Sequence, residues 1–142
     1  MLTVNQLLRV KGHQVFSLAP TDTVLRAIEI MADRHIGALL VMHHGSLLGI
    51  ISERDYARKV ILADRSSRDT PVSDIMTSPA VTVTPGDTVH HCMQLMTDHR
   101  FRHLPVVDAG RVVGMLSIGD LVKAVMEEQS VQIQELERYI AG

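Results

Sequence analysis

The sequence predicts an α/β fold of the α+β type, with two pseudo-symmetric β-α-β-β-α units packed sheet to sheet and a C-terminal helix. The main observation is an internal repeat, since residues 20–60 align without gaps with residues 85–125. The 142 residues, 46% of them hydrophobic and 21% charged, suit one compact globular molecule. A duplicated unit of about 60 residues leaves an apolar face exposed, so we expect the two copies to pack together. We assign residues 1–65 to the first unit, 66–126 to the second and 127–142 to the terminal helix.

The first unit begins with the alternating run 15–18, which is typical of a strand. Pro20 ends that strand, and Asp22 is an N-cap type residue for the helix that follows. The helix is predicted from apolar residues at i, i+3, i+4 and i+7, namely Val24, Ala27, Ile28 and Met31. Two apolar runs joined by a turn at Gly45 then predict a hairpin. A second helix is expected to start near Ser52.

The second unit repeats this order, with a strand at 80–84, a helix from Val89, a hairpin turning at Gly110 and a helix starting near Ser117. The polar segment 63–71 is typical of a surface linker. Residues 72–79 are expected to form a short helical turn that leads into the second unit. Residues 4–8 are their counterpart before the first unit.

Residues 127–140 are strongly helical in pattern and continue a stripe that starts inside the second unit. Its members follow one another in steps of four and three: Val122, Met126, Gln129, Ile133, Leu136 and Ile140. Two interpretations remain open. The helix packs on its own domain, or it forms the interface of a dimer.

A polar motif of the form Gly-x-x-Ser-x-x-Asp occurs in both units, ending at Ser52 and Asp55 and at Ser117 and Asp120. Ser-x-x-Asp is a capping box, in which each side chain accepts a backbone N–H at a helix start. The same carboxylate, facing a cleft, can instead accept hydrogen bonds from ribose hydroxyls. A helix N-terminus beside it suits anionic groups. Both interpretations are compatible with the sequence.

Several classes of function lack their usual signals. The net charge of −2 and the 3% of aromatic residues make nucleic acid an improbable partner. No apolar run reaches membrane-spanning length, and the N-terminus lacks a signal-peptide pattern, so we expect a cytoplasmic protein without membrane contact. The single Cys92, at the position of Ala27 in the repeat, suits a small buried residue. No metal motif, nucleophile elbow or phosphate-binding glycine loop occurs, so we expect neither an enzyme, nor a metal site, nor a required cofactor.

The two repeated units, the duplicated Ser-x-x-Asp motif and the segment 100–106 together resemble a tandem pair of CBS domains, or Bateman module, of the small stand-alone bacterial type. This resemblance implies a regulatory module that binds adenosine-containing ligands in clefts between the units and signals to a separate partner. AMP is the first expectation, with ADP, ATP, NAD(H) and S-adenosylmethionine as further candidates. The resemblance also implies a homodimer. The alternative is a ligand-free dimerisation or scaffold protein.

By motif match, the resemblance implies ribose binding by Asp55 and Asp120, with Ser52 and Ser117 beside the ribose or phosphate. Ile51 and Leu116 are expected to contact the base through apolar surface. The strand entries are expected to line the adenine or phosphate walls: Ile36, Gly37, Ala38, Arg102, His103, Leu104 and Pro105. The phosphate cations are expected to be Arg54, Arg102 and His103, then Lys11 and Arg58. Because the repeat sets Arg54 against Gly119, the two clefts are expected to differ.

Overall fold

The first unit contains a three-stranded sheet with a helix on either side of its hairpin along the chain. In the computed structural model, which describes residues 1–141, this unit comprises β1 (Ser17–Leu18), α2 (Val24–Arg34), β2 (Ala38–His43), β3 (Ser46–Ser52) and α3 (Glu53–Tyr56). Strand β1 pairs parallel to β2, and β2 pairs antiparallel to β3. A π-helical turn, Ala57–Ile61, continues α3. The predicted β-α-β-β-α order is confirmed here.

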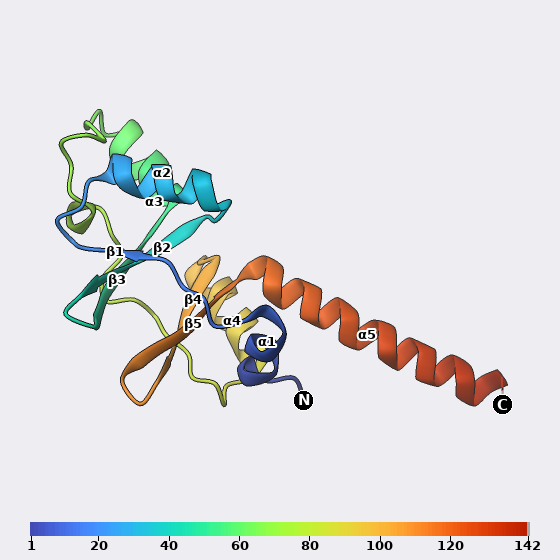
Figure 1. The fold of residues 1–142 in the computed structure, drawn as a ribbon. Helices are drawn as coiled ribbons and strands as arrows, with labels where there is room; N and C mark the ends of the chain where they lie inside the picture. The colour runs from blue at the N-terminus through green and yellow to red at the C-terminus, as the bar shows by residue number, and fades with distance from the viewer. Residues whose placement is uncertain (142) are drawn as a thin grey trace.

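The second unit has the same hairpin but a weaker first strand. It comprises α4 (Val89–His99), β4 (His103–Asp108), β5 (Arg111–Ser117) and α5 (Ile118–Ala141). In place of the predicted strand at 80–84, only Val83 pairs, in a parallel bridge with Val106. The sheets of the two units lie next to each other, with α2 and α3 at one end of the body and α4 and α1 at the other (Figure 1).

The helix starts of the two units are capped alike, although by a residue next to the predicted one. The hydroxyls of Thr23 and Thr88 accept the backbone N–H groups of Arg26 and His91, at 3.1 and 3.0 Å. Asp22, which the sequence analysis proposed as the cap type residue, accepts the N–H of Ala19 instead, at 2.8 Å. The Asp22 carboxylate therefore stabilises the turn that precedes the helix, and the threonine hydroxyl accepts a free backbone N–H of the first helical turn.

Each hydrophobic core includes the segment that precedes the other unit in the chain. Helix α1 (Val4–Lys11) buries Val4, Leu7 and Leu8 in the core of the second unit, although it precedes the first unit in the chain. The 3-10 turn Val72–Asp74 buries Val72 in the core of the first unit. The packing thus crosses the boundary that the sequence analysis set between residues 65 and 66, and it ties each unit to the chain of the other.

These two segments explain the glycine of each repeated motif. A Cβ atom built on Gly49 would lie 2.6 Å from the carbonyl oxygen of Thr77, and one on Gly114 would lie 2.6 Å from Leu8 Cδ2. Thr77 and Ile50 exchange two backbone hydrogen bonds, at 2.9 and 3.1 Å, which hold the passing segment on β3. Only glycine leaves space for a chain to cross each strand this closely.

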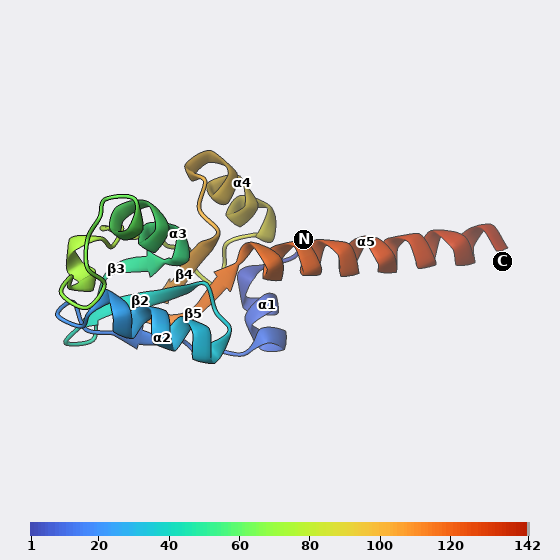
Figure 2. The ribbon, with the colours of Figure 1, turned by 90° about the horizontal axis from the view of Figure 1, so that it is seen from above.

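Helix α5 runs without a break from the body of the second unit into a long projecting segment (Figure 2). The predicted boundary between residues 126 and 127 therefore falls inside one continuous helix. Gly142, the last residue of the predicted terminal segment, lies outside the described residues. Within residues 1–141, no helix combines the length and the apolar character needed to cross a bilayer.

Candidate functional site

A cavity of about 470 Å³ opens where the two units meet. The first unit supplies Gly37, the end of β3 and the helical turns from Ser52 to Lys59, and the second unit supplies residues 99–103. Thr77 and Val81, from the connection between the units, complete the wall. A molecule bound in this cavity would contact both units at once.

Asp55 is held at one wall by the start of α3. Its Oδ2 accepts the backbone N–H and the hydroxyl of Ser52, at 2.9 and 3.0 Å, and Ser52 Oγ accepts the N–H of Asp55 at 3.2 Å. Lys59 Nζ, one helical turn later, lies 2.9 Å from Asp55 Oδ1. The residue is 9% exposed. The capping-box interpretation is therefore confirmed, and the carboxylate also lines the cavity.

The cavity walls are rich in cations. Five basic side chains line it, against the two carboxylates Glu53 and Asp55. The basic residues are Arg54, Arg58, Lys59, Arg100 and Arg102. Such an excess of positive charge in a concave site attracts anions.

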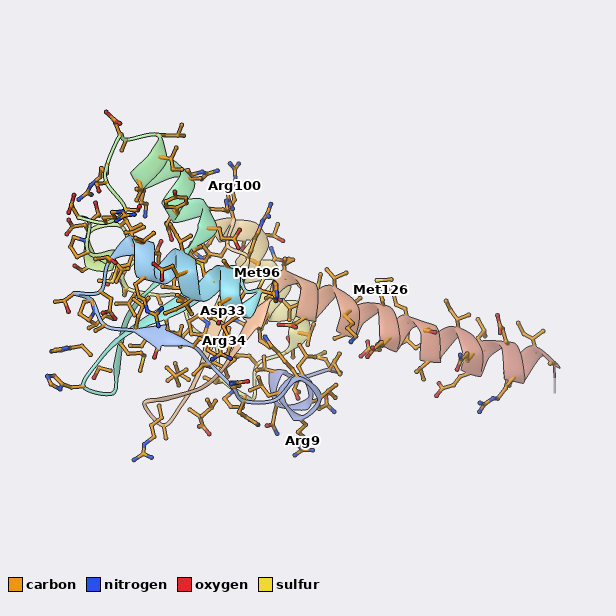
Figure 3. The ribbon with its side chains drawn as sticks, turned by 45° about the horizontal axis from the view of Figure 1, so that its top comes forward. Arg9, Asp33, Arg34, Met96, Arg100 and Met126 are labelled. Carbon is orange, nitrogen blue, oxygen red and sulfur yellow. The ribbon has the colours of Figure 1, made fainter. Side chains whose placement is uncertain are left out.

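Two of these cations also hold the walls in place. Arg54 Nη1 donates to the carbonyl of Arg100, at 2.9 Å, and so joins the two units beside the cavity. Arg100 lies at the end of α4, beside α3 of the other unit (Figure 3). Lys59 Nζ donates to the carbonyl of Ile75 at 2.9 Å. The remaining guanidinium N–H groups of Arg54 are available for an anionic ligand.

The second unit contributes flat ring surfaces. His99 and Phe101 stack with their centroids 5.3 Å apart and their planes 12° apart. A flat base can stack on such rings. His103 lies against Gly37 of the first unit, because a Cβ on Gly37 would be 3.3 Å from His103 Cε1. Burial, with help from Lys11 and Arg102 and against the opposing effect of Asp120, lowers the pKa of His103. The ring is therefore held towards its neutral form.

Asp120, the counterpart of Asp55, has a different environment. Lys11 Nζ, from the end of α1, lies 2.5 Å from Asp120 Oδ2 and donates to the carbonyl of Met115. As in the first unit, the carboxylate and the serine cap each other's backbone: Ser117 N–H donates to Asp120 Oδ2 at 2.8 Å, and Asp120 N–H donates to Ser117 Oγ at 3.2 Å. Burial alone raises the pKa of Asp120, but the hydrogen bonds from Lys11 and Ser117 and the charge of Lys11 outweigh it and lower that pKa. The second carboxylate is thus paired with a lysine from the start of the chain.

The structure brings together seven of the predicted site residues and separates the others. Those lining the cavity are Gly37, Ser52, Arg54, Asp55, Arg58, Arg102 and His103. Lys11, Ser117 and Asp120 form the separate cluster just described. The two units therefore do differ at this point, as the repeat comparison predicts.

The apolar contacts expected for the base need correction. Ile51 and Leu116 are completely buried in the two cores, and Ile50, one residue earlier, lines the cavity. Successive side chains of a strand point to opposite faces, so the prediction chose the wrong face of β3 and β5. Ala38, Leu104 and Pro105 are likewise buried, and Ile36 packs against the first core.

Several lining residues escaped the sequence analysis. They are Ile50, Glu53, Lys59, Thr77, Val81, His99, Arg100 and Phe101. The spacing of Asp55 and Lys59, one helical turn apart, was a usable signal for an ion pair. Residues 99–101 carry no such pattern, because only the packing of the two units brings them to the cavity.

The site suits binding of an anionic, flat ligand. The only thiol of the chain, Cys92, is buried in the second core, and burial together with Asp87 raises its pKa to about 11, against the lowering effect of a backbone hydrogen bond. It is therefore no activated nucleophile. Among residues 1–141, no group of three or more histidine, cysteine or acidic residues is placed to hold a metal ion.

Comparison with known proteins agrees with this arrangement. The CBS domain model matches residues 9–62 and again 72–127. The mitochondrial CBS domain-containing protein CBSX3 of Arabidopsis thaliana is 43% identical over 149 aligned residues, which cover 99% of this chain and 72% of that protein. A solved CBS-domain protein of Burkholderia ambifaria is 48% identical with a TM-score of 0.86, over 89% of this chain and 96% of the other.

A more distant solved structure contains ligands. It is a CBS domain pair in complex with 5′-methylthioadenosine and S-adenosyl-L-methionine, 25% identical with a TM-score of 0.78, over 90% of this chain and 98% of that one. The two family matches coincide with the two units of the fold, and together they span most of the sequence. This chain therefore belongs to the CBS domain family, as a tandem pair of CBS domains.

Proposed function

We propose that the chain is a regulatory module that binds an adenosine-containing ligand, AMP first among them, in the cavity beside Asp55. The observation that carries this proposal is the composition of that cavity, where two carboxylates of α3, Asp55 among them, five cations and a stacked ring pair line the same space. The distant CBS pair that holds two adenosine compounds supports it. The ligand acts as a regulator and is not a permanently bound cofactor.

Asp55 is the proposed ribose acceptor. An ionised carboxylate offers about four acceptor positions. Ser52 uses two of these through its N–H and hydroxyl, and Lys59 uses a third. One ribose hydroxyl can therefore bind directly, and both can bind once Lys59 turns away. The lysine then becomes a further cation for the phosphate.

The proposed signal is a change in how the two units are held together. A ligand that contacts residues 52–59 of one unit and 99–103 of the other favours one relative orientation of the units. It shifts the equilibrium only by the difference of its affinities for the two orientations. A separate effector protein then detects that orientation, and we propose that the chain acts as a homodimer.

The first test is thermal unfolding with AMP, ADP, ATP, NAD, NADH and S-adenosylmethionine, beside adenosine and 2′-deoxy-AMP. A ligand at a hundred times its dissociation constant adds about 2.7 kcal/mol of stability, which raises Tm by several degrees for a chain of this size. We expect AMP to give such a shift and 2′-deoxy-AMP a smaller one, since it lacks a hydroxyl for Asp55.

Asp55→Asn is the matching variant, with Asp120→Asn as its control. We expect Asp55→Asn to lower the affinity for AMP by tenfold or more, in line with the loss of a hydrogen bond to a charged group. It should also reduce the preference for AMP over 2′-deoxy-AMP. Asp120→Asn is expected to leave both affinities unchanged. An unaltered preference in Asp55→Asn would contradict the ribose assignment.

A panel in which no compound shifts Tm, for protein freed of bound nucleotide by unfolding and refolding, would contradict the sensor proposal. The ligand-free scaffold would then be favoured. The exposed apolar face of α5 is the observation that suits that second function.

A further inference from the structure

The projecting part of α5 exposes an apolar stripe to solvent. Met126, Ile133, Leu136 and Ile140 are 63, 57, 58 and 76% exposed. The hydrophobic core of the second unit includes Leu121, and Ala124 and Val125 pack against it, but no residue after Val125 belongs to that cluster. Figure 3 shows Met126 on the part of the helix that leaves the body. A helical stretch of this length without a packing partner is marginal in water, so this segment calls for one.

We propose that the partner is the same helix of a second copy, in a parallel, in-register, two-stranded coiled coil. This inference specifies the surface behind the homodimer proposed above and rests on that part of the proposed function. It does not depend on which ligand the cavity binds.

The order of side chains along the stripe selects two parallel strands. Steps of four and three place Met126, Ile133 and Ile140 at the a positions of a heptad and Val122, Gln129 and Leu136 at the d positions. β-branched residues at a combined with leucine at d favour parallel dimers. In this sequence that pattern occurs at Ile133, Leu136 and Ile140.

The single polar residue of the stripe fixes the register and the direction. In a parallel pair, Gln129 lies opposite Gln129 of the other copy, where two amides can donate to and accept from each other. An antiparallel pair centred on the same stripe would set Gln129 against Ile133 and bury an amide without a partner. One polar layer of this kind specifies alignment at some cost in stability.

The charges of the segment do not oppose the pairing. Glu127, Glu128, Glu135 and Arg138 occupy b, c and f positions, which face away from the seam. The flanking e and g positions carry Lys123, Val125, Ser130, Gln132, Glu137 and Tyr139. In the parallel register Gln132 lies beside Glu137 of the other copy, so an amide meets a carboxylate and no like charges meet.

A shallow groove continues the stripe at the root of the projecting segment. Its lining comes from one face of α5: Gly119, Val122, Lys123, Met126, Glu127 and Ser130. The seam can therefore begin at the body of the second unit. The seam then extends over more than two heptads, and Gln129 is its one polar layer.

Disulfide trapping tests the register. The background is the full chain with Cys92→Ala, since alanine already occupies the equivalent position, Ala27, in the first unit. In this background Gln129→Cys is compared with Val131→Cys. Residue 129 lies in the proposed seam, and residue 131, 53% exposed, lies at the outer f position. We expect mild oxidation to convert Gln129→Cys to a covalent dimer and to leave Val131→Cys monomeric. Equal trapping of the two, or none at 129, overturns the proposal.

Aspartate substitutions in the stripe test how much the seam contributes to the stability of the dimer. We expect Ile133→Asp with Leu136→Asp to raise the dimer dissociation constant by roughly 100-fold or more in sedimentation analysis, because each chain brings two carboxylates into the seam. Val131→Asp, at a residue equally exposed but outside the stripe, is expected to change it by less than about threefold.

Three outcomes overturn the proposal. The native chain stays monomeric, as it would if another protein or a membrane covered the stripe. The dimer survives the double substitution, or Val131→Asp weakens the dimer as much as the double substitution does. The nucleotide panel on the double variant keeps the two proposals apart. A retained AMP shift in a monomeric variant shows that cavity and coiled coil are separate functions, and a missing shift in a stable native dimer contradicts the sensor alone.

Discussion

At the scale of single residues, the repeated Ser-x-x-Asp motif shows how one pattern serves two purposes. Both copies cap a helix through the same reciprocal contacts. They differ in the cation that reaches the carboxylate, which is Lys59 of the same helix for Asp55 and Lys11 of α1 for Asp120. The capping explains why the motif is present twice, and only the first carboxylate, Asp55, lines the cavity described above.

His103 makes stability depend on pH. Its pKa is lowered in the folded chain, chiefly by burial, so the unfolded chain takes up a proton first as pH falls. The contribution to stability is complete well above the ordinary value of 6.5 and is lost as pH falls below it towards the folded pKa. We expect His103→Gln to lose less stability than the native chain between pH 7.5 and pH 5.5 in denaturant titrations.

The control for this prediction is His43→Gln, at an exposed position near the tip of the first hairpin. It should retain the native acid dependence. Identical slopes for the native chain and His103→Gln would show that burial of this ring does not contribute.

At the scale of elements, the crossing of a chain segment over each hairpin is the feature that joins the units. Segment 72–77 crosses β3, and α1 crosses β5, each above a motif glycine. The two contacts are not equivalent. Gly49 faces a backbone carbonyl, while Gly114 faces the end of a leucine side chain. A backbone atom cannot move without breaking the hydrogen bonds between Thr77 and Ile50.

The two glycines should therefore respond differently to the same substitution. We expect Gly49→Ala to destabilise the fold by about 3 kcal/mol and Gly114→Ala by only about 1–2 kcal/mol, the range for overpacked sites whose surroundings can adjust. Chemical denaturation measures both. Equal costs would mean that Leu8 is as rigid as the backbone.

A double variant isolates the cause at the second site. Leu8→Ala alone is expected to cost about 2–5 kcal/mol, because Leu8 is completely buried. Once that side chain is shortened, adding Gly114→Ala should cost almost nothing further. A fully additive pair would locate the Gly114 contact elsewhere.

At the scale of the whole molecule, contacts between distant parts of the chain make the pair asymmetric. Lys11 and Asp120 are 109 residues apart, and their ion pair joins the end of α1 to the first turn of α5. Arg54 joins the units on the other side, at the carbonyl of Arg100. The two sides of a duplicated molecule thus receive different cations, because the repeat sets Arg54 against Gly119 and Lys59 against Ala124.

The ion pair gives a second pH-dependent prediction. Because the pKa of Asp120 is lowered in the fold, its contribution is complete above the ordinary value of 3.8 and is lost as pH falls through the folded pKa. We expect Lys11→Met to lower stability by about 0.5–1 kcal/mol at neutral pH, a modest value because both side chains are partly exposed to solvent.

The difference between Lys11→Met and the native chain should shrink as pH falls below 3.8 and through the lowered pKa of the folded carboxylate, because the protonated group no longer pairs with the lysine. Arg111→Met, at an exposed position at the start of β5, is the control and should match the native chain at every pH. A constant difference across the pH range would assign the effect to packing of the lysine stem.

The sequence by itself determined the duplication, the order of strands and helices and the capping boxes, because these depend on residues close together in the chain. Periodicity and the spacing of Ser52 and Asp55 are local signals, and local hydrogen bonds realise them. For the same reason seven of the expected cavity residues were found, at the motif, in the helical turn after it and at the strand entries.

Only the tertiary structure decided the rest. It placed α1 on the second core, turned Ile50 rather than Ile51 towards the cavity, brought Arg100 and Phe101 to its wall, and paired Lys11 with Asp120. Each of these depends on contacts between segments far apart in the chain, or on which face of a strand becomes buried. The burial of apolar surface between the two units sets both, and no short stretch of sequence encodes that choice.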